Sequence, residues 1–139
     1  MSNLTPKTFN RLLWTAQSAA ALLFLFAGSM KFIMPADKMQ QGPVIFSIAF
    51  LHFIGICECL GALGLILPSV SRIQTWLTPL AAAGLTIIMI GAATVTVIGM
   101  GVAPAIIPVV VGVLTTWIAY ARTRVAPISE APNRVLRTA

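Results

Sequence analysis

The side chains that could do chemistry in this chain gather in one apolar stretch, residues 44–67, which ends at Pro68. Its middle holds four ionisable side chains: His52, Cys57, Glu58 and Cys59. The stretch is long enough to cross a bilayer, since about 20 apolar residues span roughly 30 Å. A carboxylate near the centre of such a span costs about 2.5–3.5 kcal/mol on insertion scales. Because Glu58 is the only acidic residue in any apolar stretch, we expect the other spans to pack around it.

The neighbours of Glu58 on its predicted helix indicate where its carboxylate points. Gly55, Gly61 and Ala62 lie three or four positions away, so they share its face. Small residues mark the faces where membrane helices approach closely. We therefore expect Glu58 to face the bundle interior.

Three kinds of side chain could satisfy Glu58: Lys31, Gln17 and the threonines of the later spans. Among them, Lys31 is the charged partner that we predict. A second interpretation stays open, because the long stem of Lys31 could instead extend its ammonium to the lipid headgroups. Glu58 itself is either a ligand or proton site, or a structural anchor that is hydrogen-bonded between helices.

The other reactive side chains give weaker signals. His52 is a further candidate for a ligand or proton site, although an interfacial or hydrogen-bonded histidine is more common. Cys57 and Cys59 are separated by roughly 200° around a helix, so they cannot form a disulfide with each other. The sequence offers no second histidine and no cluster of carboxylates for a metal. We therefore assign no catalytic residue and no metal site.

The composition places the chain in a membrane. Of its 139 residues, 58% are hydrophobic and 9% are charged, with a mean hydropathy of +0.96, whereas soluble domains are about 25% charged. The lipid bilayer is therefore its expected environment. The net charge of +6 does not indicate nucleic acid, because the basic residues lie at the ends of apolar stretches and in the C-terminal tail. No aromatic side chains alternate with them to stack bases.

Four apolar stretches must position the candidate residues. They cover residues 12–33, 44–67, 76–100 and 102–121. We predict an all-α fold, a polytopic membrane protein with a four-transmembrane-helix bundle. A cleavable signal peptide is excluded, because the first stretch exceeds the about 7–15 residues of a signal core and three more stretches follow.

Proline and glycine predict the connections between the spans. Two prolines and a glycine favour a non-helical loop over residues 34–43, and Pro68 favours a short turn over residues 68–72. Residues 44–49 could be the start of the second helix or a re-entrant segment.

The chain divides into an N-terminal cytoplasmic segment (residues 1–10), a transmembrane domain (residues 11–124) and a C-terminal cytoplasmic tail expected to be disordered (residues 125–139). Four spans put both termini on one side. That side carries seven basic residues: Lys7, Arg11, Arg72, Arg122, Arg124, Arg134 and Arg137. The other side carries Lys31 and Lys38. This bias predicts a multi-pass protein of the cell inner membrane with both termini in the cytoplasm.

Four segments carry a resemblance to a known family: residues 28–35, 54–68, 84–92 and 120–122. The first contains a Gly-x-x-Lys motif that ends at Lys31, and the second contains a Gly-x-x-Glu motif that ends at Glu58. With its four spans, the sequence resembles the DoxX-like family of small four-helix membrane proteins from about residue 11 to residue 124.

The resemblance implies that Lys31 and Glu58 occupy the family's paired polar positions. It also implies a non-catalytic subunit or helper of a membrane complex, with a membrane-protein partner or a second copy of the chain and no cofactor. The alternative is a quinone-binding subunit of a membrane oxidoreductase, with Glu58 as the proton-exchanging group. A transporter is disfavoured, because four short spans show no inverted repeat. Residues 94–100 depart from the family pattern, since they carry no histidine or charge where relatives often have one.

Overall fold

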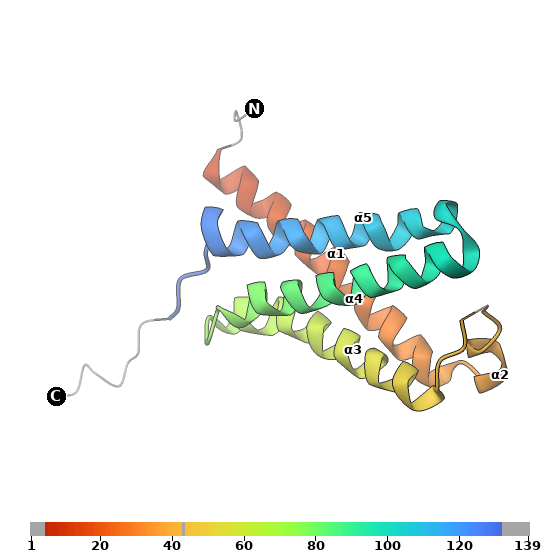
Figure 1. Cartoon of the computed structure of the whole chain (residues 1–139). Coiled ribbons are helices and arrows are strands. Elements are labelled where there is room, and N and C mark those ends of the chain that lie inside the picture. Colours follow the sequence, from red (N-terminus) through yellow and green to blue (C-terminus); the bar gives the residue numbers. More distant parts are fainter. Residues whose placement is uncertain (1–4, 43, 132–139) are drawn as a thin grey trace.

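Four long helices run back and forth in the computed structural model, which describes residues 5–42 and 44–131, and the first of them crosses the other three obliquely (Figure 1). In chain order the elements are α1 Pro6–Ile33, α2 Ala36–Met39, α3 Ile48–Ser71, α4 Leu77–Met100, α5 Val102–Tyr120 and the π-helical turn η1 Ala121–Val125. No strand occurs in this described part of the chain. The predicted all-α fold is therefore confirmed.

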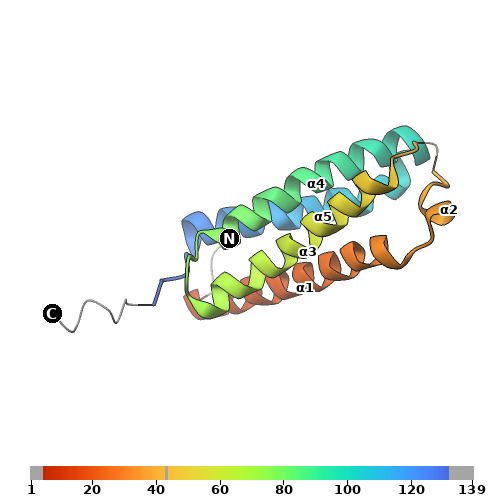
Figure 2. The same cartoon turned by 90° about the horizontal axis from the view of Figure 1, so that it is seen from below.

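The helices form an antiparallel bundle whose neighbours follow chain order. α1 packs on α3, α3 on α4 and α4 on α5, and a smaller contact joins α1 to α5. The start of α1, the α3–α4 turn and the end of α5 lie together, and we call this the terminal end (Figure 1 and Figure 2). The opposite end holds α2 and the α4–α5 turn, and we call it the α2 end.

All four long helices can cross a bilayer by length and composition, the last one counted together with η1. Only 17–33% of the most apolar stretch of each helix is buried inside the bundle. Large aliphatic side chains such as Leu22, Ile87 and Ile98 point outwards. An apolar surface of this extent is typical of contact with lipid tails. The prediction of a four-span membrane bundle is confirmed.

The connection between α1 and α3 corrects the prediction of a wholly non-helical loop over residues 34–43. It contains the one-turn helix α2, which begins directly after Pro35. Asp37 in its first turn and Lys38 in its last turn complement the helix dipole. A proline ends the helix before it but allows a new one to start after it.

Helix α3 begins later than the apolar stretch that encodes it. Its first residue is Ile48, and the hydroxyl of Ser47 caps it by accepting a hydrogen bond from the N–H of Phe50 at 3.2 Å. The residues between Pro43 and this cap are not helical. The apolar start of the stretch therefore belongs to the connection at the α2 end.

The predicted turn over residues 68–72 is wrong, because α3 continues through Pro68 for almost a further turn. A proline inside a helix removes one hydrogen bond and crowds the preceding turn. A neighbouring helix stabilises the turn before Pro68, since the side-chain amide of Gln17 on α1 donates to the carbonyl of Leu65. The chain reverses only at Arg72, which adopts the left-handed conformation with φ 55°.

The structure describes part of each terminal segment that was predicted to flank the membrane domain. α1 begins at Pro6, inside the segment predicted to precede the membrane domain. The tail is described as far as Ala131, which lies outside any helix and donates its N–H to the carbonyl of Arg72 at 3.0 Å. The remaining parts of the two terminal segments, residues 1–4 and 132–139, lie outside the described residues.

Two glycines allow α1 and α3 to cross closely. A Cβ on Gly28 would lie 2.8 Å from the carbonyl oxygen of Gly55 and 2.7 Å from the sulfur of Cys59. Small residues permit such close approach of backbones inside membranes. The crossing lies one turn before Lys31 on α1 and one turn before Glu58 on α3, so it brings these two side chains within reach of each other.

Gly28→Ala should destabilise the bundle, because its Cβ would meet the backbone of Gly55, which cannot move aside as a flexible side chain can. Overpacking of this kind costs about 1–3 kcal/mol. Thermal unfolding in detergent measures the loss. Gly84→Ala is the matched control, since no neighbouring atom lies within 4 Å of the added Cβ. Equal midpoints for the two variants would contradict a close crossing at Gly28.

Candidate functional site

Lys31 and Glu58 form an ion pair beside the crossing of α1 and α3. The ammonium nitrogen of Lys31 lies 2.5 Å from a carboxylate oxygen of Glu58, and no other ion pair occurs within residues 5–42 and 44–131. Glu58 is 3% exposed, whereas the side chain of Lys31 is 26% exposed. The structure confirms that Glu58 faces the bundle interior and that Lys31 is its charged partner.

The direction of the Lys31 side chain decides between the two interpretations of this residue. Its ammonium also donates to the carbonyl of Ala27, four residues earlier on α1, at 3.4 Å. The side chain therefore bends back along α1, away from the helix end, as the tilt of the Cα–Cβ bond favours. The interpretation of Lys31 as a headgroup anchor is wrong. Pairing instead neutralises both charges inside the apolar bundle.

A cavity of about 500 Å³ lies next to the ion pair, between α3 and α4. Its walls are mostly aromatic and aliphatic, and its polar side chains are Lys31, Glu58 and Thr96. The rings of Phe46 and Phe50 form part of the wall, with centroids 5.4 Å apart. Small-molecule sites typically enclose about 300–1,000 Å³, with mostly apolar walls and a few polar groups. The cavity is thus suited to an apolar molecule with a polar end.

The structure leaves His52 outside this cavity. Its ring stacks on Phe32 of α1, with the centroids 5.1 Å apart and the planes 17° from parallel. The two cysteines are free and face different neighbours, as their spacing predicts: Cys59 packs at the crossing, and Cys57 lines a groove between α3 and α4. No group of three potential metal ligands occurs in the described part of the chain.

Gln17, the remaining candidate, lies at the terminal end and not beside the ion pair. It is completely buried. Its amide donates to the carbonyl of Leu65 and, at 2.9 Å, to the hydroxyl of Ser69. Its side-chain oxygen accepts a hydrogen bond from Nε of Arg122 at 2.8 Å. The structure therefore assigns Gln17 to a second polar cluster.

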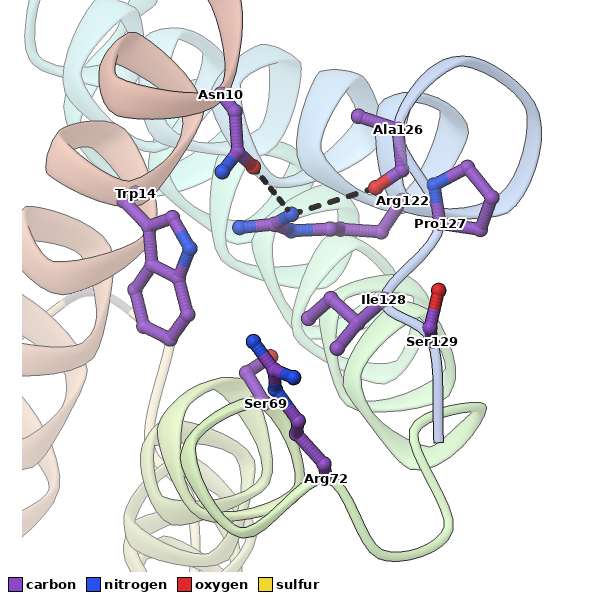
Figure 3. A pocket seen from close by; sticks show the side chains of 9 residues that line it. All are labelled: Asn10, Trp14, Ser69, Arg72, Arg122, Ala126, Pro127, Ile128 and Ser129. Carbon is purple, nitrogen blue, oxygen red and sulfur yellow. Dashed lines mark hydrogen bonds between the residues drawn. The ribbon is translucent and has the colours of Figure 1, made fainter. Parts of the chain in front are cut away.

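Arg122 is the central residue of this second cluster. The sequence places it among the basic residues of the terminal side and in a segment of the family resemblance, but does not mark it as a site residue. It is 4% exposed, and it lies in the wider π-helical turn η1. It donates to the side chain of Asn10 at 3.0 Å, and its guanidinium lies 5.2 Å from the centre of the Trp14 ring (Figure 3). Asn10, Trp14 and Gln17 recur at helical spacing and therefore share one face of α1. This face, which carries polar groups, was the sequence signal that could have indicated a buried polar cluster.

Comparison with models of known protein families identifies the family of the chain. The model of the DoxX-like family matches residues 15–118. The chain belongs to the DoxX-like family. The matched stretch of this DoxX-like protein includes Gln17, Lys31 and Glu58, whereas Arg122 lies beyond it. No curated protein and no solved structure matches the chain.

Glu58→Gln should destabilise this DoxX-like protein, because the ammonium of Lys31 then loses its counter-charge. Removing one partner of a buried pair typically costs about 3–5 kcal/mol. The partial exposure of Lys31 puts the expected loss at the lower end of that range. Thermal unfolding in detergent measures it. Adding Lys31→Met to Glu58→Gln should recover part of the loss, because both charges are then gone.

Asp37→Asn is the matched control for this series. It removes the same charge from an exposed position on the one-turn helix α2, where only an interaction with the helix dipole is lost, and should lower the unfolding midpoint far less than Glu58→Gln. An unchanged midpoint for Glu58→Gln would contradict a stabilising ion pair, and so would a double variant less stable than the single one.

Proposed function

We propose that this DoxX-like protein is an integral, non-catalytic subunit or helper of a complex in the cell inner membrane. Its partner contributes a transmembrane helix that packs on α4. Both termini lie in the cytoplasm.

The glycines of α4 are the observation that carries this proposal. Gly84 and Gly91 are seven residues apart and therefore lie on one face. Both are exposed, and no neighbouring atom lies within 4 Å of either Cβ position. A Cβ on Gly61 of α3, by contrast, would lie 2.6 Å from Leu85. The bundle thus uses Gly61 for its own packing and leaves the two glycines of α4 to another helix.

An apolar groove supports the same location for the partner. It lies beside Gly84 between α3 and α4 and encloses about 550 Å³. Leu60, Leu80 and Ile87 border it with largely exposed side chains. Association of helices in lipid depends on close packing of backbones and side chains, since lipid tails are as apolar as leucine. A groove next to an open glycine provides such packing.

Gly84→Leu should release the partner without destabilising the bundle, because the leucine would occupy the space that the partner helix needs. The measurement is the amount of stoichiometric partner that co-purifies in mild detergent, together with the unfolding midpoint. Val113→Leu is the matched control, since Val113 is exposed on α5 away from the groove. Undiminished co-purification with Gly84→Leu would contradict the proposed docking face. Loss of a dimer of this chain instead would identify a second copy as the partner.

A second candidate function is favoured by the cavity beside the ion pair. A quinone has an apolar body and a polar ring, and the cavity offers aromatic walls with Lys31 and Glu58 at one side. In this alternative the protein is the quinone-binding subunit of a membrane oxidoreductase, and Glu58 exchanges protons with the bound ring.

Titration of the purified protein with a short-chain quinone tests this alternative. It predicts a saturable change in the absorption spectrum that Glu58→Gln weakens and Asp37→Asn leaves intact. A response that rises linearly with quinone, as in empty detergent micelles, would exclude quinone binding at the cavity.

The proposed orientation rests on the basic residues of the two ends. Among the described residues, the terminal end holds Lys7, Arg11, Arg72, Arg122 and Arg124. The α2 end holds Lys38, together with Lys31, which is paired with Glu58. Basic residues accumulate on the cytoplasmic side of inner-membrane proteins. A fluorescent reporter fused to the C-terminus should therefore fluoresce, and a phosphatase fused there should be inactive. The reverse pattern would contradict cytoplasmic termini.

A further inference from the structure

Arg122 is a buried cation that has no negative partner among the described residues. Its Nε donates to Gln17, and its Nη1 donates to Asn10 at 3.0 Å and to the carbonyl of Ala126 at 3.3 Å. All three acceptors are neutral. Its Nη2 is buried and has no hydrogen-bond partner within residues 5–42 and 44–131. Burying a charge without a counter-charge costs free energy. An anion bound beside Arg122 would therefore stabilise this arrangement.

The acidic side chains of the chain do not supply that anion. There are three of them. Asp37 lies on α2 at the opposite end, and Glu58 is paired with Lys31. Glu130 is exposed and forms no ion pair with any described residue. Within the described residues, no acidic side chain neutralises Arg122, and its charge is left for a molecule from outside.

Arg122 is one of the residues that line a pocket of about 300 Å³ at the terminal end. Figure 3 shows Arg72 reaching from the end of α3 toward the gap between Trp14 and Arg122. Ser69 and Ser129 also line this pocket. Two guanidinium groups that converge on one space repel each other unless an anion lies between them.

The wall opposite α1 comes from the C-terminal segment. Pro127, Ile128 and Ser129 line the pocket, and the segment is held on both sides of them. Arg122 donates to the carbonyl of Ala126 before these residues, and the N–H of Ala131 donates to Arg72 after them. The two arginines therefore both position this wall and face the space that it encloses.

We propose that this pocket binds the phosphate group of an anionic ligand between Arg72 and Arg122. A guanidinium presents its N–H donors as a planar fork that matches phosphate oxygens, and such bonds are roughly twice as strong as neutral ones. The pocket lies at the terminal end, where Trp14 and several basic residues gather as they do at the headgroup level of a bilayer. The phosphate group comes either from an anionic lipid or from a soluble phosphate.

Binding of single lipids to the full-length protein in a neutral detergent tests this site. Native mass spectrometry is carried out with phosphatidylglycerol, which carries a net negative charge, and with zwitterionic phosphatidylcholine. One phosphatidylglycerol should bind in preference to phosphatidylcholine. Arg72→Gln should weaken this binding about tenfold, as expected for the loss of a charged fork, while it leaves the hydrogen bonds of Arg122 to α1 in place.

Arg124→Gln is the matched control, because Arg124 is exposed in the same turn and its loss changes the net charge equally. It should weaken binding less than about twofold, since exposed charges are screened by salt. Arg122→Lys keeps the charge, removes the fork and should weaken binding as Arg72→Gln does.

Inorganic phosphate distinguishes the two sources of the ligand. If it raises the unfolding midpoint in a way that depends on Arg72, and displaces phosphatidylglycerol, the site accepts soluble phosphate. If only the lipid binds, the ligand is a headgroup. Equal weakening by Arg72→Gln and Arg124→Gln would overturn the proposal, because attraction would then be a property of the surface charge. Binding of neither probe would overturn it as well.

Discussion

A carboxylate in the middle of an apolar span has to be neutralised, and the ion pair of Glu58 with Lys31 is the interaction on which the arrangement of α1 and α3 depends. Lys31 lies in the last turn of its helix, but its side chain bends back to a carboxylate that is 3% exposed. This is possible only because Gly28 and Gly55 let the two backbones nearly touch one turn away. The glycines and the charges therefore act together. Close packing at the glycines brings Lys31 within reach of Glu58, and the ion pair in turn fixes the register of α1 against α3.

The second polar cluster fixes the same two helices at the other end. Gln17 of α1 joins the carbonyl of Leu65 and the hydroxyl of Ser69 on α3, and Arg122 connects this group to the end of α5. The two clusters lie 14 residues apart on α1, or about 21 Å along the helix axis. Apolar burial distinguishes poorly between helix registers in lipid, since both sides of each contact are apolar. The ion pair and the Gln17 cluster lie at two different depths, and both can form in only one register of α1 against α3, so they select that register.

Much of this fold follows from local pattern, and the failures at Pro68 and Arg122 share one cause. Four apolar stretches predicted the spans, and the small residues around Glu58 predicted its inward direction, because both signals lie within single helices. Pro68 misled the prediction, since a hydrogen bond from Gln17 on another helix stabilises the turn around it. Arg122 was missed for a related reason. A basic residue after an aromatic one is typical of an interface, and its burial depends on η1 and on partners from α1 that are more than a hundred residues away in sequence.

The central claim is that Glu58 is ionised and paired inside the membrane domain, and infrared difference spectroscopy tests it most directly. The spectrum of Glu58→Gln is subtracted from that of the unaltered protein in lipid at neutral pH. The other two acidic side chains, Asp37 and Glu130, are exposed and cancel in the subtraction. The account predicts that the difference contains the stretching bands of a carboxylate. The carbonyl band of a protonated carboxyl group in their place would contradict it.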